Sequence, residues 1–568
     1  MRFNLSPNEE TPAATPSIDD HAMMDRAVRL ALRGTGAVEP NPRVGCVIVD
    51  NATGAVLGEG WHRAYGEIHA EIDALRDLLV RRSLLDWPLP DLPVGSADGD
   101  GIPGKSGGIS GDVPAGSART NAIWKRIAEV LREHSGLLRE ATMFVTLEPC
   151  AHLGKTPACT DAIRLACPSR VVIGCHDPNP TAAGGADALA EHGIRVDVLA
   201  HAKAERLVRS FVHRQQSGRP WVLVKWAQTL DGRIATRTGH SRWISNAMSR
   251  RTVHRIRGRV DAILTGLGTV LADDPTLTAR DVRRRRSGDR SLLRVVIDPD
   301  LDLPPDSNLI RTCHEAPLVI CCGFEGRSLR EEGASTARTE ADLQRQSSPI
   351  AWIDGDLGID TARDDAGSAL LDPAEDPLRR RRYERLVRAI EEVGPSAARS
   401  VQIVGFRQSW EAAGAGPAGD EVGGLTQNSA ASPEEGSTRT QPTDGPTPIA
   451  ALPTMTADRT ARTAALLDPC LRWLSSQREV TTVLVEAGGG LVGGLIRQRL
   501  VNELRVFIAP KIVGDVQAAA PARGLQIETM AGTLPLRLER VGYLGEDVEL
   551  RYHVPAGTLT ASGPNSST

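Results

Sequence analysis

Apolar positions in the first third of the chain switch between helical spacing and short continuous runs. Helical spacing over 20–34 and 68–80 predicts two helices, the first with Asp19 or Asp20 as its N-cap and Gly34 at its end. A third helical stretch lies at 123–134, and runs rich in β-branched residues predict buried strands at 44–50, 141–149 and 169–178. Helices that alternate with strands predict a layered α/β domain.

Strand candidates dominate the rest of the chain. A second domain is predicted to begin near Gly218-Arg219-Pro220, where a turn sequence precedes an apolar run. The strand candidates of this half are 220–228, 261–266, 292–299, 317–322, 400–406, 481–488 and 503–514. The spacing between them again leaves room for helices, so this half is also predicted to be α/β.

Stretches without periodicity interrupt both halves. Gly95 to Ala118 is rich in glycine and nearly free of large apolar residues, and 411–460 is rich in Ala, Gly, Pro, Ser and Thr. We therefore expect a first domain over 21–205 with a flexible insertion at about 83–120. We expect a second domain over 218–556 with flexible insertions at about 325–348 and 407–465, and disordered tails over 1–20 and 557–568.

Composition narrows the possible functions. The 568 residues are 40% hydrophobic and only 3% aromatic, and the net charge is −4 with a pI near 6.4. This balance argues against a protein that coats nucleic acid by bulk charge. Two arginine runs, Arg283–Arg286 and Arg379–Arg382, are short and flanked by acidic residues, so they are interpreted as solvated loop charge.

The location expected from the sequence is the cytoplasm. The chain has no apolar run long enough for a transmembrane helix, and its N-terminus lacks the apolar core of a secretory signal. Nine cysteines spread over a long chain do not suggest a disulfide framework. Some of these cysteines are candidates for metal ligands.

A His-x-Glu pair and two distant cysteines form the first chemical motif. His69 and Glu71 begin the helix predicted at 68–80, and Cys150 follows Pro149 at the end of a strand, with Cys159 nine residues later. Zinc deaminases combine His-x-Glu with Pro-Cys-x-x-Cys: one imidazole and two thiolates hold zinc, and the glutamate moves protons. The spacing between the cysteines departs from that signature, so zinc ligands and ordinary buried cysteines both remain possible on spacing alone.

The wider sequence resembles one family, the bifunctional deaminase–reductases of riboflavin biosynthesis. The resemblance rests on PNPRVGCVIV (40–49), GEGWHRAYGEIHAEIDAL (58–75), TLEPCAHLGKTPACTDAI (146–163) and DPNP (177–180). In that family an insertion separates the two cysteines, as it does here. The resemblance implies one zinc per chain on His69, Cys150 and Cys159, Glu71 as the proton shuttle, and a cytidine-deaminase-like three-layer α/β domain. It also implies a substrate pocket lined by Asn41, His62, His152, Lys155, Asp177 and Asn179. We interpret the remaining cysteines as structural.

A glycine-rich turn is the second motif. The segment 483–494 reads as a strand, a turn and a helix start, where glycines let a phosphate approach the backbone. Gly488, Gly490 and Gly493 fit Gly-x-Gly-x-x-Gly, but a Rossmann domain would place this motif after its first strand. A plain tight turn and a nucleotide site both remain open on this motif alone.

The segments 225–245, 253–280, 294–299, 483–496 and 509–514 resemble the reductase half of the same family. The resemblance implies a dihydrofolate-reductase-like fold that uses NADPH. By position, the cofactor contacts are Ala227, Trp243, Thr269, Asp273, Gly488, Gly489, Gly490, Leu491, Val492, Gly493 and Gly494, and the substrate contacts are Ser241, Arg257, Leu277, Arg280 and Glu486. Pro299 departs from the serine that the family often has after this strand.

These inferences predict an enzyme that acts on a small phosphoribosyl pyrimidine. The first domain would hydrolyse the amino group of a phosphoribosylated diaminopyrimidinone, and the second would reduce the ribosyl to a ribityl chain with NADPH. The resemblance also suggests a homo-oligomer, with no nucleic-acid or membrane partner. One alternative is a zinc deaminase of another nucleotide or nucleic-acid base with a degenerate reductase-like half, and a second is a non-catalytic scaffold.

Overall fold

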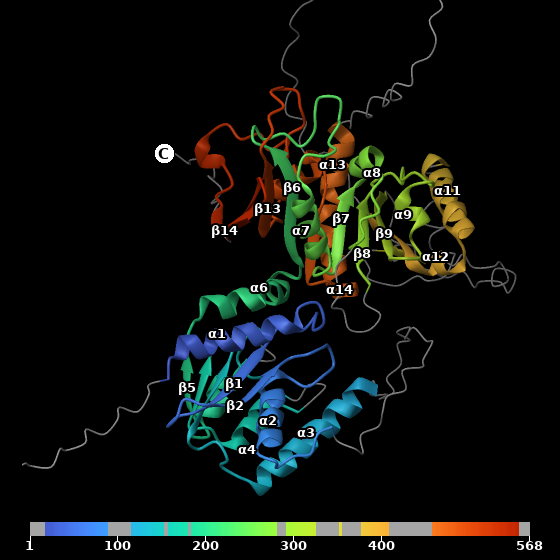
Figure 1. Cartoon of the computed structure of the whole chain (residues 1–568). Coiled ribbons are helices and arrows are strands. Elements are labelled where there is room, and N and C mark those ends of the chain that lie inside the picture. Colours follow the sequence, from blue (N-terminus) through green and yellow to red (C-terminus); the bar gives the residue numbers. More distant parts are fainter. Residues whose placement is uncertain are drawn as a thin grey trace, which may run out of the picture.

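The chain folds around two β-sheets, each with its own helices (Figure 1). The computed structural model describes residues 18–88, 115–152, 157–179, 183–280, 291–324, 351–354, 377–407 and 457–555. The first half contains a five-stranded sheet in the order β2-β1-β3-β4-β5, and the second half a ten-stranded sheet.

The first sheet lies between two layers of helices. Its strands are β1 (Gly45–Asp50), β2 (Val56–Trp61), β3 (Ala141–Val145), β4 (Arg170–Ile173) and β5 (Arg195–Val198). β1 pairs antiparallel with β2 and β3, and β3, β4 and β5 are parallel. On one face lies α1 (Asp20–Ala31), with α6 (Ala202–Ser217) beside it; the other face carries α2 (Ala70–Arg81), α3 (Ala115–Glu133), α4 (Cys159–Ala166) and α5 (Gly185–Ala190). This is the three-layer arrangement expected for the first domain.

The second sheet is parallel except at one edge. Its order is β10-β11-β9-β8-β7-β12-β6-β13-β15-β14, and only the last two pairings are antiparallel. The strands are β6 (Trp221–Thr229), β7 (Ala262–Gly266), β8 (Leu293–Ile297), β9 (Leu318–Phe324), β10 (Ala351–Asp354), β11 (Val401–Arg407), β12 (Thr482–Val485), β13 (Glu503–Ala509), β14 (Arg537–Leu544) and β15 (Asp547–His553).

Helices cover both faces of this second sheet. One face carries α7 (Ala247–Arg257), α8 (Leu267–Asp273), α9 (Asn308–Arg311), α11 (Pro377–Val393) and α12 (Pro395–Ser400). The other carries α14 (Leu467–Gln477) and α15 (Gly489–Arg497), with α13 (Ala457–Ala465) packed on both. Because successive strands are parallel, the loops that follow β6, β7 and β12 meet at one edge of the sheet.

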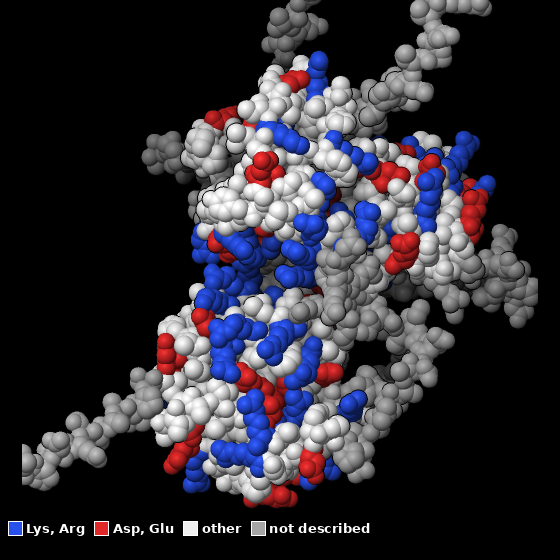
Figure 2. All heavy atoms as spheres, viewed as in Figure 1, with Lys and Arg blue, Asp and Glu red and all other residues white. Residues whose placement is uncertain are grey.

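Helix α6 joins the two halves. Its residues Ala204, Leu207 and Val208 pack into the first half beside α1. Its Arg209 donates to Glu503 of β13 (2.9 Å) and to Glu539 of β14 (2.8 Å) in the second half. Figure 2 shows Lys and Arg gathered at the waist between the halves. The helix is therefore fixed to one half by apolar contacts and to the other by ion pairs.

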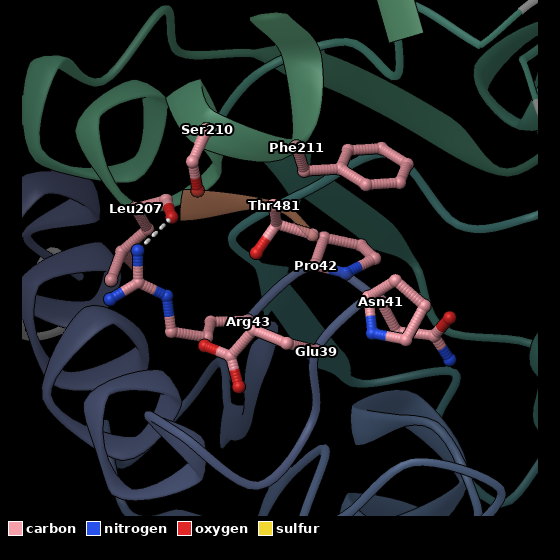
Figure 3. Close-up of a pocket in the computed structure, with 9 residues that line it drawn as sticks. Glu39, Asn41, Pro42, Arg43, Leu207, Ser210, Phe211 and Thr481 are labelled. Atoms are coloured by element: carbon pink, nitrogen blue, oxygen red, sulfur yellow. Dashed lines mark hydrogen bonds between the residues drawn. The ribbon is translucent and has the colours of Figure 1, made fainter. Parts of the chain in front are cut away.

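A small cavity lies under α6 at this junction (Figure 3). The loop 39–43 of the first half and Thr481 of the second half both contribute to its wall. Arg43 donates to the carbonyl oxygen of Leu207 in α6 (2.8 Å). Burial raises the pKa of the neighbouring Glu39, and the charge of Asp261 in the second half adds to this effect. Because Asn41 belongs to the same loop, the junction and the predicted deaminase pocket share one segment of chain.

Helices lie at the ends of three segments that were expected to be irregular, and the interpretation of one arginine run was wrong. The predicted tail over 1–20 overlaps α1, which Asp19 caps by accepting from the Ala22 N–H (3.1 Å). The insertions predicted at 83–120 and 407–465 overlap α3 and α13, whose apolar residues have helical spacing within otherwise polar sequence. Arg379 and Arg382 lie in α11 and bond to the loop after β8, so they are not free loop charge. Arg283–Arg286 and 325–348 lie outside the described residues.

Candidate active sites

Three sulfur and nitrogen ligands converge in the first half. The Nδ1 atom of His69 lies 3.3 Å from Sγ of Cys159 and 3.7 Å from Sγ of Cys150, and all three ligand atoms lie within 4.8 Å of one another. A tetrahedral zinc with one nitrogen and two sulfur ligands requires separations of about 3.5–3.8 Å between ligand atoms. The two observed separations differ from this range by no more than about 0.2 Å, so the set can hold zinc and leaves a fourth position for water.

The local fold explains how these ligands meet. His69 is the N-cap of α2, Cys150 follows β3, and Cys159 opens α4. Helix α2 can approach β2 closely because Gly60 has no side chain: a Cβ atom there would lie 2.2 Å from the backbone nitrogen of Ala74. The backbone N–H of Cys159 donates to Sγ of Cys150 (3.4 Å). The side-chain hydrogen bond from Cys159 is the main cause that lowers the pKa of the Cys150 thiol to about 4, which favours the thiolate that a metal binds.

Glu71 lies in the first turn of α2 and is buried. Burial raises the pKa of its carboxyl to about 7, although the neighbouring His69 opposes this. A carboxyl that titrates near neutral pH can both accept and return a proton. The structure thus places beside the ligands a group suited to the proton shuttle that the resemblance implies.

His62 and Asn41 form a second layer of the site. His62 is buried, and its Nδ1–H donates to the carbonyl oxygen of Ile68 (3.1 Å), which leaves Nε2 facing the Asn41 amide (3.4 Å). Burial, together with the charge of His69, lowers the pKa of His62 to about 4. His62 is therefore neutral near pH 7 and presents a hydrogen-bond acceptor to the amide of Asn41.

The loop that carries Asp177 and Asn179 depends on a residue that the sequence analysis missed. Glu148 is buried and accepts from the backbone N–H groups of Asp177 (3.1 Å), Gly184 (3.1 Å) and Ala186 (3.0 Å). Asp177 in turn accepts from the backbone N–H of Asn179 (2.9 Å). Glu148 lies two residues before Cys150, so the metal site and the loop are linked through it.

Two predicted pocket residues, His152 and Lys155, remain to be placed. His152 is exposed, and its charge lowers the pKa of Asp177 against the larger opposing effect of burial. Lys155 lies outside the described residues. The structure therefore brings Asn41 and His62 together, and Asp177 and Asn179 together, around the three metal ligands.

A second site lies where β6, β7 and β12 end. Gly488 caps α15, and its N–H donates to the hydroxyl of Thr269 in α8 (3.1 Å). A Cβ atom at Gly490 would meet nothing within 4 Å, so the backbone is open to a ligand here. A Cβ atom at Gly489 or Gly493 would instead lie 2.3 Å or 1.8 Å from a carbonyl oxygen of the segment 520–523.

The glycine-rich segment therefore has two separate tasks. Gly488 and Gly490 present open backbone at a helix N-terminus, as a phosphate of a nucleotide requires. Gly489 and Gly493 allow the close approach of 520–523, and Leu491 and Val492 pack in the core beside Gly494. The open part of the turn fits a dinucleotide cofactor.

A buried ion pair lies beside this turn. Arg257 of α7 donates through Nε and a terminal nitrogen to the two carboxylate oxygens of Glu486 (2.6 and 3.1 Å), and through its other nitrogen to the carbonyl oxygen of Thr278 (3.0 Å). The ammonium of Lys225 in β6 lies 3.6 Å from the same carboxylate. Burial opposes ionisation, but the charges of Arg257 and Lys225 lower the pKa of Glu486 to about 2. Lys225 is a second residue that the sequence analysis missed, because an isolated lysine in a strand forms no motif.

Two of the other predicted reductase residues, Ser241 and Trp243, lie in the loop between β6 and α7, beside Asp273 of α8. The hydroxyl of Ser241 lies 3.4 Å from the carboxylate of Asp273, and Arg242 donates to the backbone oxygen of Asp273 (2.7 Å). Trp243 is exposed, with Arg250 stacked over its ring. Ala227 packs beside the core on β6, Leu277 is buried and Arg280 is exposed. Since the side chain of Leu277 is in the core, only its backbone can face a substrate.

Comparison with known proteins adds the family. The family model "RibD C-terminal domain" matches residues 220–344 and 437–550, and "Cytidine and deoxycytidylate deaminase zinc-binding region" matches 17–90. The riboflavin biosynthesis protein RibD of Aquifex aeolicus is 34% identical over 319 residues, which are 55% of this chain and 72% of that protein. The chain belongs to the RibD family. It is a bifunctional deaminase–reductase of riboflavin biosynthesis, with a zinc-binding deaminase domain and a reductase domain that uses NADPH.

Further RibD proteins agree with this assignment. The Escherichia coli RibD is 37% identical over 265 residues, 46% of this chain and 56% of that protein. The structure of Acinetobacter baumannii RibD superposes with a TM-score of 0.54 at 23% identity, over 94% of this chain and 98% of that one, which shows a shared fold. The predicted fold class and bifunctional activity are thereby confirmed, and a deaminase of another base with a degenerate reductase half is not favoured. Among the described residues, no helix is long and apolar enough to cross a membrane.

Proposed function

We propose that His69, Cys150 and Cys159 hold one zinc ion and that Glu71 moves protons in the hydrolysis of 2,5-diamino-6-(5-phosphoribosylamino)pyrimidin-4-one. The products are 5-amino-6-(5-phosphoribosylamino)uracil and ammonia. The observation that carries this proposal is the convergence of the three ligand atoms within 4.8 Å beside a buried carboxyl. Bound zinc supplies a Lewis acid that makes water nucleophilic at neutral pH.

The side chains around the ligands then have distinct tasks. Glu71 accepts a proton from water and returns it to the leaving amino group. Asn41, His62, Asp177 and Asn179 bind and orient the pyrimidine and ribose phosphate, and His152 and Lys155 reach the phosphate. The neutral state of His62 supports a role as a hydrogen-bonding group rather than as a charge.

For the second site we propose that NADPH lies against the open turn at Gly488 and Gly490, with Thr269, Asp273, Trp243 and Ala227 beside it. Ser241, Leu277, Arg280 and the Glu486 region would hold the ribosyl group of the deaminated product, and bound NADPH would supply the hydride that reduces it. The reduction also needs one proton, and the ammonium of Lys225 beside Glu486 is placed to donate it.

The experiment measures both reactions in one protein. Purified chain is supplied with the diaminopyrimidinone ribose phosphate, and ammonia release, NADPH oxidation and zinc content are followed. Glu71→Gln is expected to keep about one zinc per chain and to release ammonia about 100-fold or more slowly. The same variant should oxidise NADPH normally when it receives the deaminated uracil directly. Undiminished ammonia release by Glu71→Gln would disprove the assigned role.

We also propose that the enzyme is a cytoplasmic homo-oligomer. Strand β14 forms the edge of the large sheet, and Leu538, Val541 and Tyr543 on it are exposed, Tyr543 by 80%. An exposed edge strand with apolar side chains favours pairing with a second copy. Two thiols that must stay reduced to bind zinc favour the cytoplasm. Light scattering of the wild-type chain and of Tyr543→Glu tests the oligomer, and a monomer in both samples would contradict it.

A further inference from the structure

Two buried thiols face each other in the core of the reductase half. The Sγ atoms of Cys321 in β9 and Cys470 in α14 lie 3.2 Å apart. Both side chains are fully buried in the apolar layer between the sheet and α14, with Leu467 and Leu471 beside them. Neither cysteine takes part in zinc binding or in the predicted contacts of the cofactor and the substrate.

We propose that Cys321 and Cys470 form an oxidisable dithiol, which a peroxide converts to a disulfide that joins β9 to α14. A disulfide requires an S–S distance of about 2.05 Å, so the two sulfur atoms must approach each other by only about 1.1 Å. One thiol is oxidised by the peroxide to a sulfenic acid, and the peroxide is reduced to water or an alcohol. The second thiol displaces water from that sulfenic acid and forms the S–S bond.

The adjacent cysteine shows that the pairing is specific. Cys322 points to the opposite face of the sheet, where its thiol lies 3.6 Å from the carbonyl oxygen of Val404. Cys322 is as deeply buried as Cys321, but the contact of its thiol is with a backbone oxygen and not with another thiol. It is therefore a matched control within the same strand.

The positions of the two cysteines determine how much a disulfide would stabilise the fold and how fast it would form. Cys321 and Cys470 are 149 residues apart in the sequence, so a bond between them would close a long loop of the unfolded chain. Burial raises the pKa of the Cys321 thiol, and the contact with Cys470 adds to this effect. Because the thiolate is the reactive form, oxidation should be slow and should require local opening of α14.

The experiment maps the bond in the full-length enzyme. The zinc-loaded chain is treated with hydrogen peroxide, quenched, alkylated in denaturant and digested with trypsin for mass spectrometry. The tryptic peptide from Thr312 to Arg327 carries Cys313, Cys321 and Cys322, so the variants decide which thiol is linked to Cys470. Wild type and Cys322→Ser should give the linked peptide, and Cys321→Ser and Cys470→Ser should give at least tenfold less of it.

Thermal unfolding of the wild-type chain tests the disulfide without any variant. Oxidised wild-type chain should unfold at a temperature about 5 °C or more above the reduced chain, and a thiol reductant should reverse this shift. Recovery of Cys321 and Cys470 as alkylated thiols after peroxide treatment that oxidises Cys167 would overturn the proposal. A Cys470 link to Cys313 or Cys322 would overturn it as well.

Discussion

Arg257 and Glu486 hold each other by two parallel hydrogen bonds of 2.6 and 3.1 Å at the edge where the reductase strands end. The resemblance to the family places both residues in the substrate site, where an unpaired guanidinium could bind the ribose phosphate through two hydrogen bonds. The fork of Arg257 is instead occupied by Glu486, so that bidentate contact is not available in this arrangement. The side chain of Arg280 is exposed, and we expect it to take the phosphate instead.

The ion pair predicts how stability depends on pH. The pKa of Glu486 is about 2 in the folded chain against an ordinary value of 4.5, so its contribution is complete above pH 4.5 and is lost as the pH falls towards 2. The shift corresponds to about 3 kcal/mol. Denaturant titrations at a series of pH values should show a gap in unfolding free energy between wild type and Glu486→Gln that narrows below pH 4.5. Glu384→Gln, from an exposed pair with Arg380, is the control and should show no such change.

Two glycines in the cofactor turn should respond differently to substitution. We expect a change at Gly490 to weaken cofactor binding and a change at Gly493 to destabilise the fold. Gly490→Ala places a methyl group in open space, so the fold should be unchanged while the KM for NADPH rises about tenfold or more. Gly493→Ala places the methyl group 1.8 Å from the carbonyl oxygen of Arg523, so this variant should unfold at lower temperature. Thermal unfolding and NADPH kinetics of the two variants separate these effects. Equal losses of stability in Gly490→Ala and Gly493→Ala would contradict the separate roles of these two glycines.

The sequence predicted the ligand set of the proposed zinc site, but it did not predict every strand around that site. His69, Glu71, Cys150 and Cys159 could be found because zinc chemistry restricts both residue type and order. Strand β2 was missed because Gly58 and Gly60 weaken its strand pattern, and the reason for these glycines is the close approach of α2. That approach is a tertiary contact, which no local pattern contains.

Local sequence patterns also fail to identify residues whose role depends on a partner distant in the sequence. Glu148 and Lys225 were missed because a single buried carboxylate or ammonium has no periodicity and no partner close in sequence. Arg257 was predicted to contact a substrate, but it pairs with Glu486, which lies 229 positions later in the sequence. Such roles follow only from the three-dimensional arrangement.

From the hydrogen bonds of Glu148 we predict that this residue positions the loop of Asp177 and Asn179 in the deaminase site. Glu148→Gln keeps the shape of the side chain but replaces one of the two carboxylate oxygens that accept from Asp177, Gly184 and Ala186. The loop of Asp177 and Asn179 should become less ordered, so the KM of deamination should rise about tenfold while zinc content stays at about one per chain. Glu140→Gln, an exposed residue before β3, is the control. Loss of zinc from Glu148→Gln would show that the carboxylate supports the metal ligands instead.

From the ion pairs of Arg209 we predict that the unfolding of one half is coupled to the unfolding of the other. Its bonds to Glu503 and Glu539 join α6 to the reductase sheet, and its guanidinium stacks 4.7 Å above the ring of Trp221. Arg209→Ala should cost about 1.5–3 kcal/mol, because hydrogen bonds between charged groups are lost at a mostly buried position. Calorimetry should then resolve separate unfolding of the two halves at a lower temperature than in wild type. Arg206→Ala, an exposed arginine on the same helix, should leave the profile unchanged. If both variants unfold like wild type, the apolar contacts of α6 are sufficient to hold the halves together.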